Sequence, residues 1–207
     1  MRAGFSEDPM KIVKFLLLLI AALVIVIILA GFLLSGEYSA ERSITIDASP
    51  EQVHYYVGDL ANWDQWTPWN EMDPSIVTTL GEKSSGVGAS QTWTGKDGRG
   101  ELTFTRCDSG GIEYDMAFIQ GDNRWPAQCA MLYSPEGDST TVRWTMSGKM
   151  ENFMGRYLAV MMPSWITRDF DKGLEKLKAK AEALPPVLEE PAPAEEADQA
   201  AEEAAAG

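Results

Sequence analysis

The sequence is poor in the residues that most often bind metals and perform acid–base catalysis. Its 207 residues include one histidine, His54, and two cysteines, Cys107 and Cys129. A metal site needs several such ligands at short spacing, and a catalytic centre needs a nucleophile, a base and an orienting group. The sequence therefore predicts no metal, no cofactor and no catalytic residue. These shortages argue against an enzyme, but the sequence alone leaves catalysis open.

Positive charge is also scarce. The chain has 17 Lys and Arg residues against 31 Asp and Glu residues, which gives a formal net charge of −14. A protein that binds nucleic acid, or adheres broadly to anionic lipid, presents basic surface to the phosphates. This composition excludes nucleic acid as a partner.

The two cysteines are not expected to form a disulfide. The strand pattern below assigns them to strands that are separated by a third strand, which places them about 9 to 10 Å apart. A disulfide requires a much closer approach of the two backbones. Two buried or half-buried thiols are the predicted state.

One long hydrophobic run stands near the N-terminus. Residues 12–34 are apolar apart from Lys14 and, as a helix, would extend about 35 Å, enough to cross a bilayer. A cleaved signal peptide is the alternative, but its apolar region is shorter and ends in small residues. Lys11 and Lys14 begin the segment and Glu37 and Glu41 follow it, so the positive-inside rule places the N-terminus in the cytoplasm. We expect a single-pass protein of the cytoplasmic membrane with an extracytoplasmic globular domain.

The chain thus divides into four parts. Residues 1–11 form a cytoplasmic segment, whose true start is either Met1 or Met10, and residues 12–34 form the transmembrane helix. Residues 37–184 form the folded domain. Residues 185–207 contain seven acidic residues and neither basic nor aromatic ones, so this tail cannot bury enough apolar surface to fold by itself.

The folded domain reads as one strand, two short helices, six strands and a long helix. Alternating Ile44 and Ile46 indicate the first strand, and Ser49 with Pro50 begins a helix, although Gln52 is expected to miss an ideal capping box. Six alternating segments between residues 76 and 150 have connections too short for parallel crossovers, so an antiparallel sheet is expected. The last helix, from about residue 152 to 184, should bend or break near Pro163.

Several ordered segments resemble one known superfamily. They are ITIDASPEQVHYYVGDLANWDQWTPW, WTGKDGRGELTF, VRWTMSG and DKGLEKLK. In this order they resemble the START-like helix-grip superfamily, and in particular its SRPBCC or polyketide cyclase/dehydrase group. The resemblance covers about residues 38–183 and implies an α+β fold, in which a curved antiparallel sheet wraps around a long C-terminal helix.

The resemblance also implies an apolar cavity between sheet and helix. Methionine and aromatic side chains suit such an adaptable pocket. The residues expected to line it, carried over position by position, are Trp93, Phe104, Tyr114, Met116, Phe118, Met131, Trp144 and Met146 from the strands and Leu158, Met161 and Trp165 from the helix. Arg106, in phase with Phe104, is the best candidate for an inward cation that could hold an acidic head group.

Three tryptophans crowd together in the stretch NWDQWTPW. Trp63 and Trp66 lie three residues apart, so one side of a short helix carries both, and they are expected to close one end of the grip as packing residues. Trp69 follows Pro68 and is either a packing residue or a residue of the pocket mouth.

Three functions remain in play. The favoured one is a membrane-anchored domain that binds a lipid or another hydrophobic small molecule. The alternatives are an enzyme of the cyclase/dehydrase type and a structural envelope protein whose cavity is filled by its own side chains. The sequence leaves the ligand and the oligomeric state open.

Overall fold

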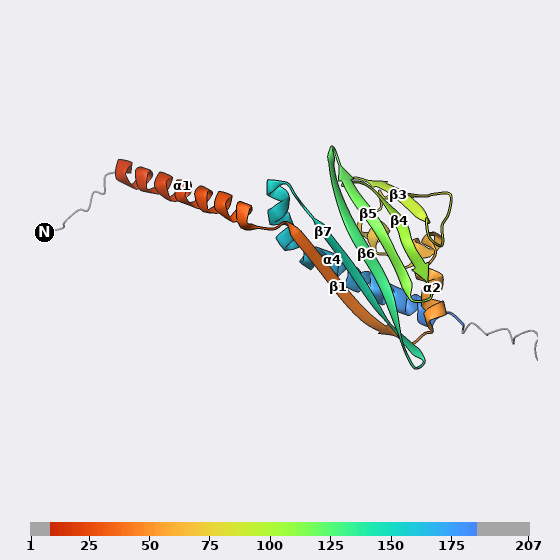
Figure 1. Cartoon of the computed structure of the whole chain (residues 1–207). Helices are drawn as coiled ribbons and strands as arrows, with labels where there is room; N and C mark the ends of the chain where they lie inside the picture. Colours follow the sequence, from red (N-terminus) through yellow and green to blue (C-terminus); the bar gives the residue numbers. More distant parts are fainter. Residues whose placement is uncertain (1–8, 186–207) are drawn as a thin grey trace, which may run out of the picture.

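The computed structural model describes residues 9–185 and contains one antiparallel sheet, a long helix against it and a separate N-terminal helix (Figure 1). The fold is the α+β helix grip expected from the sequence. In chain order the elements are α1 (Pro9–Leu33), β1 (Glu37–Ile46), α2 (Pro50–Val57), the 3₁₀ helix η1 (Leu60–Gln65), α3 (Trp69–Met72), β2 (Val77–Leu80), β3 (Ser90–Gly95), β4 (Gly98–Asp108), β5 (Gly111–Gln120), β6 (Asn123–Glu136), β7 (Ser139–Lys149) and α4 (Phe153–Glu182).

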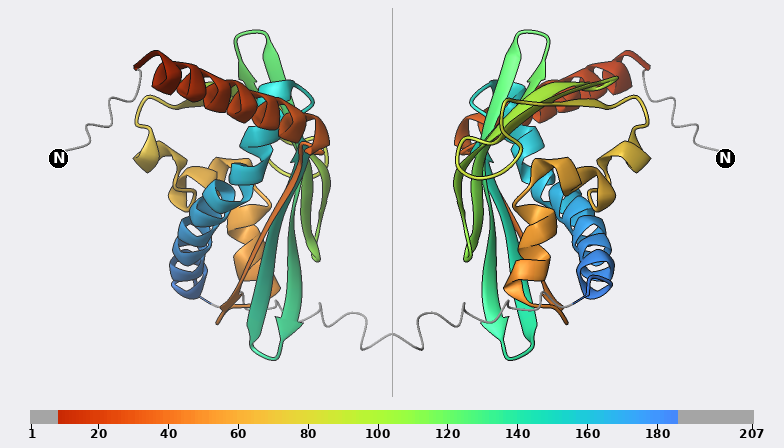
Figure 2. Two further views of the ribbon diagram at one scale, coloured as in Figure 1. Left: turned by 90° about the vertical axis from the view of Figure 1, so that its left-hand side faces the viewer. Right: turned by 90° about the vertical axis from the view of Figure 1, so that its right-hand side faces the viewer.

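The sheet has seven strands in the order β1-β7-β6-β5-β4-β3-β2, and every neighbouring pair is antiparallel. Tight hairpins join β3 through β7, whereas β1 pairs with the last strand. The helices α2 and α4 lie on the same side of the sheet (Figure 2). We call that side the inner face and the opposite side the outer face.

The helix α2 begins where its sequence supplies a complete N-terminal cap. The Ser49 side chain accepts a hydrogen bond from the Gln52 backbone N–H, and the Gln52 side chain accepts one from the Ser49 N–H. This is a capping box, so the expectation that Gln52 would miss one is wrong. Gln52 also donates to the Leu184 carbonyl at 2.7 Å, which ties α2 to the end of α4.

The helix α4 runs unbroken from Phe153 to Glu182 with Pro163 inside it. The break expected near Pro163 is therefore absent. The C-terminal part of the helix, beyond Pro163, buries Ile166, Phe170, Leu174, Leu177 and Ala181. Most of the residues before Pro163 are half-buried or exposed, so the two parts of one helix have different surroundings.

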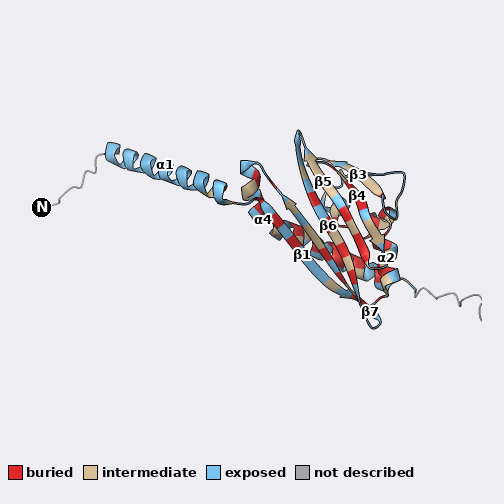
Figure 3. Ribbon diagram, in the orientation of Figure 1, coloured by how far each residue is buried: buried red, intermediate tan, exposed pale blue. Residues whose placement is uncertain are grey.

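The helix α1 spans 25 residues and begins three residues earlier, and ends one earlier, than the segment expected from the sequence. It is exposed along nearly its whole length (Figure 3). Its length and composition fit a membrane span, and a signal sequence near an N-terminus would have the same character. Residues 1–8 and the acidic tail from residue 186 lie outside the described residues.

Cys107 lies on β4 and Cys129 on β6, with β5 between them. Both thiols are free. The prediction of two unpaired cysteines on strands separated by a third is confirmed.

Candidate ligand-binding site

Strand register places the strand residues of the predicted lining on the inner face. Residues directly opposite one another in a sheet share a face, and so do residues two apart along a strand. Phe104 is opposite Tyr114, and Met131 is opposite Trp144. Gly100 of β4 is opposite Trp93 on one side and Phe118 on the other, so these two rings share the same face. The eight strand residues are thus brought to the side that carries α4.

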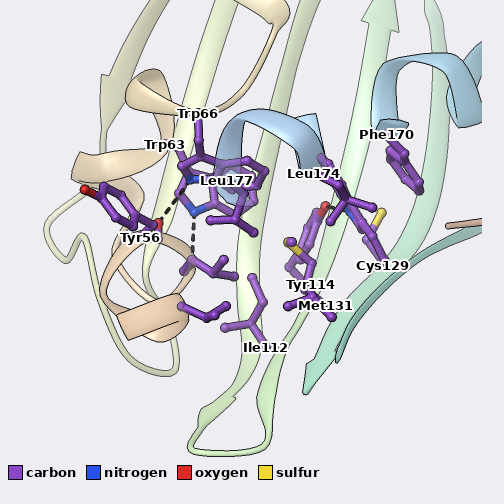
Figure 4. Packing of buried hydrophobic residues seen from close by; sticks show 14 of the residues in the cluster. Tyr56, Trp63, Trp66, Ile112, Tyr114, Cys129, Met131, Phe170, Leu174 and Leu177 are labelled. Atoms are coloured by element: carbon purple, nitrogen blue, oxygen red, sulfur yellow. Dashed lines mark hydrogen bonds between the residues drawn. The ribbon is translucent and has the colours of Figure 1, made fainter. Parts of the chain in front are cut away.

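Half of these residues belong to a filled core. Phe104, Tyr114, Met131 and Trp144 are all buried. The Trp144 ring stacks on Phe170 of α4 at a centroid distance of 4.0 Å, and its Nε1–H donates to the Tyr114 hydroxyl at 3.0 Å. Figure 4 labels Tyr114 and Met131 of the sheet and Phe170 and Leu174 of α4 in this core. At this end of the grip, side chains occupy the space where the resemblance implies a cavity.

The tryptophan cluster closes the same end. Trp63 and Trp66 are buried, and their Nε1–H groups donate to the carbonyls of Val57 and Tyr56 at 2.9 and 3.1 Å (Figure 4). Each indole therefore has its polar atom satisfied by the end of α2 and its rings in the core. The packing role expected for these two residues agrees with this arrangement.

Trp69 is only half-buried. It begins α3, and its ring lies 5.8 Å from that of Trp144. Trp69 therefore covers the core at the edge of the inner face. At this position part of Trp69 remains exposed to solvent.

The remaining lining residues lie toward the other end of the inner face and are less covered. Trp93, Met116, Phe118 and Met146 are half-buried, and Trp125, which the sequence reading left out, is half-buried among them with its ring 6.4 Å from Phe118. Trp125 could have been found from its phase, since it is two residues before Ala127 on the inner face of β6.

The helix residues of the predicted lining are exposed. Leu158, Met161 and Trp165 are between 41% and 50% accessible and, at spacings of three and four, share one side of α4. We group them with the half-buried inner-face residues as the candidate lining that the core leaves uncovered, and call this set the open half. Its members are Trp69, Trp93, Met116, Phe118, Trp125, Met146, Leu158, Met161 and Trp165.

The expectation that Arg106 points inward is wrong. The register shifts between Phe104 and Arg106, so a β-bulge at this point turns Arg106 to the outer face beside Glu113. Its guanidinium donates to Asp108 at 2.7 Å and to Glu113 at 3.0 Å. Arg106 is therefore paired on the wet side of the sheet and offers no cation to an inner-face ligand.

The polar groups inside the core stay protonated near neutral pH. Burial raises the pKa of the Cys129 thiol to about 12 and holds the pKa of the Tyr114 hydroxyl well above its usual value. A thiol or phenol that stays protonated is a poor nucleophile and a poor base. The inner face is thus electrically neutral as well as apolar.

One Cys–His contact, which the sequence analysis did not foresee, lies at the end of the inner face that α2 covers. His54 Nε2 is 3.7 Å from Cys107 Sγ, and Nδ1 is 3.4 Å from the Tyr133 hydroxyl, beside a hollow of about 420 Å³. The two residues come from α2 and β4, 53 positions apart, so no sequence motif marks them. Burial lowers the pKa of His54 and raises that of Cys107, which favours a neutral pair over an ion pair.

The lowered pKa of His54 predicts a pH effect on stability. The folded state binds fewer protons than the unfolded chain, whose histidine titrates near 6.5. The stability gained from neutral His54 is complete above pH 6.5 and is lost as the pH falls toward the lower pKa of the folded state. The negative charges of Asp108 and Glu51 act in the opposite direction and reduce this lowering of the pKa. The free energy of urea unfolding should be smaller at about pH 5.5 than at about pH 7.5. In His54→Gln this difference should shrink, and an unchanged difference would contradict the assignment.

A larger hollow, of about 960 Å³, crosses the outer face over β1, β7, β6, β5 and β4. Ion pairs border it: Arg124 with Glu101 at 2.6 Å, and Lys149 with Glu37 at 3.8 Å. Its open, charged surface differs from the apolar inner face and does not fit a hydrophobic ligand. Within residues 9–185, no three His, Cys, Asp or Glu side chains are grouped to hold a metal ion.

Comparison with solved structures finds the same fold. A protein from Chromobacterium violaceum aligns with a TM-score of 0.55 at 14% identity over 70% of this chain and 98% of its own. One from Mesorhizobium loti gives 0.55 at 12% identity over 71% and 98%, and one from Thermobifida fusca gives 0.52 at 20% over 72% and 95%. At such low sequence identity, these similarities establish the fold and nothing about function. A search of curated proteins finds no match.

The sequence profile of one family covers most of the folded domain. It is described as polyketide cyclase/dehydrase and lipid transport, and it matches residues 38–182. The match begins at the start of β1 and ends with α4, so it spans the whole helix grip. The chain therefore belongs to the polyketide cyclase/dehydrase and lipid transport family and has the SRPBCC fold.

Proposed function

We propose that this protein binds a lipid or another hydrophobic small molecule on the open half, and that α1 anchors it in a membrane. The observation that carries the proposal is the unequal filling of the grip. The end near α2 is packed by Trp144, Phe170 and their neighbours, whereas the other end leaves apolar side chains partly exposed. An apolar surface that a protein leaves partly uncovered favours contact with a hydrophobic partner.

The magnitude of apolar burial supports such binding. A ligand that buries about 300 Å² of apolar surface gains roughly 7 kcal/mol at about 25 cal/mol per Å². Before the costs of association this corresponds to a dissociation constant of the order of 10 μM. Methionine and tryptophan adapt their shape to different ligands and require no polar complement. The apolar side chains of the open half are therefore sufficient for such binding.

Catalysis receives less support from the same region. Arg106 lies on the outer face, and the buried Tyr114 and Cys129 remain protonated. An acid and a base within reach of one substrate would be needed for cyclase or dehydrase chemistry. The side chains of the open half supply neither, so binding is the better-supported function.

The proposed membrane attachment is supported by α1 and its flanking charges. Lys11 and Lys14 lie at its start, whereas Glu37 and Glu41 follow its end. The positive-inside rule orients such a helix with its N-terminus in the cytoplasm. The proposed location is therefore the cytoplasmic membrane, with the domain outside the cytoplasm.

The first experiment is native mass spectrometry of the full chain, purified from host membranes in detergent, followed by solvent extraction and lipid analysis. The proposal expects one apolar species bound at about one molecule per chain. A chain that arrives empty, and that also excludes apolar fluorescent probes, would contradict it and favour the structural alternative.

A leucine pair tests where the ligand lies. Leu158→Gln places a polar group in the open half, and we expect it to weaken binding of an apolar probe about fivefold, since half-burial of a leucine contributes roughly 1 kcal/mol. Leu132 is half-buried on the outer face opposite Arg143, so Leu132→Gln is the matched control and should leave binding unchanged. Fluorescence titration with N-phenyl-1-naphthylamine measures both. Equal affinity of the two variants for the probe would show that the ligand binds elsewhere on the protein.

A further inference from the structure

The first turns of α4 run alongside the last turns of α1. The Tyr157 hydroxyl donates to the Ile27 carbonyl, and the Phe153 ring lies 5.8 Å from Phe32. Arg156 Nη1 lies 3.4 Å from the Gly31 carbonyl and 3.5 Å from that of Phe32. Both views in Figure 2 place the end of α1 beside this part of α4. The contact fixes α4 relative to the helix that the proposed function places in the membrane.

These contacts involve residues of α1 that lie before its C-terminal end, on the membrane side of that end. Ile27 precedes Leu33 by six residues, so it lies about 9 Å further along the axis of α1. The polar layer on each side of a bilayer is roughly 5 to 8 Å thick. When α1 spans the membrane and ends at its outer surface, Tyr157 therefore reaches the level of the lipid chains.

The same part of α4 exposes a stripe of large apolar side chains. Met154, Leu158, Met161 and Trp165 are 68%, 41%, 50% and 43% accessible, and their spacings of four, three and four residues place them on one side of the helix. Arg156 is the only charged residue from Phe153 to Trp165. This segment, about 20 Å long as a helix, is mostly apolar, and its exposed side carries methionine, leucine and tryptophan side chains of the kind that enter a lipid bilayer.

From these contacts and this stripe we infer that residues 153–165 of α4 dock into the outer surface of the lipid bilayer beside α1; the inference rests on the proposed function of α1 as an anchor. The occupant of the exposed stripe is therefore lipid. Continuity with α1 supports this choice, since a soluble partner protein would have to reach a surface that α1 holds at the membrane.

The docking has a consequence for the ligand. Leu158, Met161 and Trp165 belong both to the stripe and to the open half. A ligand bound by these three residues would then also contact the surface of the bilayer. The chemical class this favours is a membrane-resident lipid rather than a water-soluble metabolite.

Spin labels on the full chain in phosphatidylcholine vesicles test the docking. The labelled variants are Met154→Cys and Leu158→Cys, and Lys172→Cys is the control, exposed on the same helix beyond Pro163. The unsubstituted chain reports any labelling of Cys107 and Cys129. Power saturation with oxygen and with a nickel chelate measures depth, because oxygen concentrates in lipid and the chelate in water.

We expect the ratio of oxygen to nickel accessibility to be about fivefold or more higher at positions 154 and 158 than at 172. Water-like ratios at both positions, in chains that float with the vesicles in a density gradient, would overturn the docking and leave the anchor standing. Chains that do not float would overturn the anchor and the docking together. Two labelled positions guard against misfolding of one variant, which circular dichroism detects.

Discussion

Replacing Trp144 with alanine is expected to lower the free energy of unfolding by about 4 kcal/mol, within the range of roughly 3 to 5 observed when a buried aromatic side chain is removed. Trp144 is fully buried on the inner face, where it stacks on Phe170 at 4.0 Å. Gly173 of α4 approaches its ring so closely that an added Cβ would lie 3.0 Å away. The backbone is thus fitted to this indole, and little nearby can move to fill the void.

A second cost arises at Tyr114. Its hydroxyl accepts the hydrogen bond from Trp144 Nε1, and the substitution leaves this buried oxygen without that donor. A buried polar group that loses its partner costs about 1 to 3 kcal/mol, part of which the aromatic range already contains. For a domain of this size, we expect the melting temperature to fall by roughly 8 to 16 °C.

The control is Trp125→Ala, the same substitution at a half-buried position of the inner face. It should cost about 1 to 2 kcal/mol, because part of the indole is already in contact with solvent. Thermal unfolding followed by near-ultraviolet circular dichroism compares the two variants. Equal losses of stability would show that the two ends of the grip are filled to the same degree, and would remove the main support for the open half.

Strand alternation and helix caps allowed most of the fold to be predicted from the sequence. The alternation of apolar and polar residues in GIEYDMAFI puts Tyr114, Met116 and Phe118 on one face, and the register of β5 agrees. Ser49 and Pro50 located the start of α2 correctly. These features are encoded locally, in the period of the side chains and in the chemistry of single turns.

The errors arose where the outcome depends on contacts made elsewhere in the chain. The β-bulge after Phe104 reversed the direction of Arg106, and no residue in that stretch marks the extra position. Phe104 and Phe118 have the same alternating pattern, yet one is buried and the other half-buried. What covers each ring depends on η1 and α4, which pack over one end of the sheet, so the sequence could predict the apolar face but not the boundary between filled and open halves.

Replacing Pro163 is expected to have the second large effect on stability, and this effect is an increase. Replacing it with alanine should raise the free energy of unfolding by about 2 kcal/mol, because proline inside a helix costs roughly 3 kcal/mol and the more flexible unfolded alanine chain returns about 0.4 to 1 of this. The new N–H can donate to the Ala159 carbonyl, one turn earlier. The melting temperature should rise by roughly 4 to 8 °C.

Pro50 provides the control, since it lies at the first turn of α2, where proline is favoured. Pro50→Ala should therefore lower stability by about 0.4 to 1 kcal/mol. Urea unfolding of both variants gives the two signs side by side. A loss of stability in Pro163→Ala would mean that the ring of Pro163 makes packing contacts worth more than the missing hydrogen bond.

The place of Pro163 in α4 gives this substitution a functional meaning. Beyond it Ile166, Phe170 and Leu174 are buried, whereas Leu158 and Met161 before it are exposed. A missing hydrogen bond at this boundary is a point where the helix can bend, so that the first part of α4 can move together with α1 while the second part stays packed on the sheet. If a ligand enters by such a movement, Pro163→Ala should slow its release without changing the residues it contacts. Stopped-flow displacement of a fluorescent apolar probe measures that rate, and an unchanged rate in the stabilised variant would show that α4 does not need to bend.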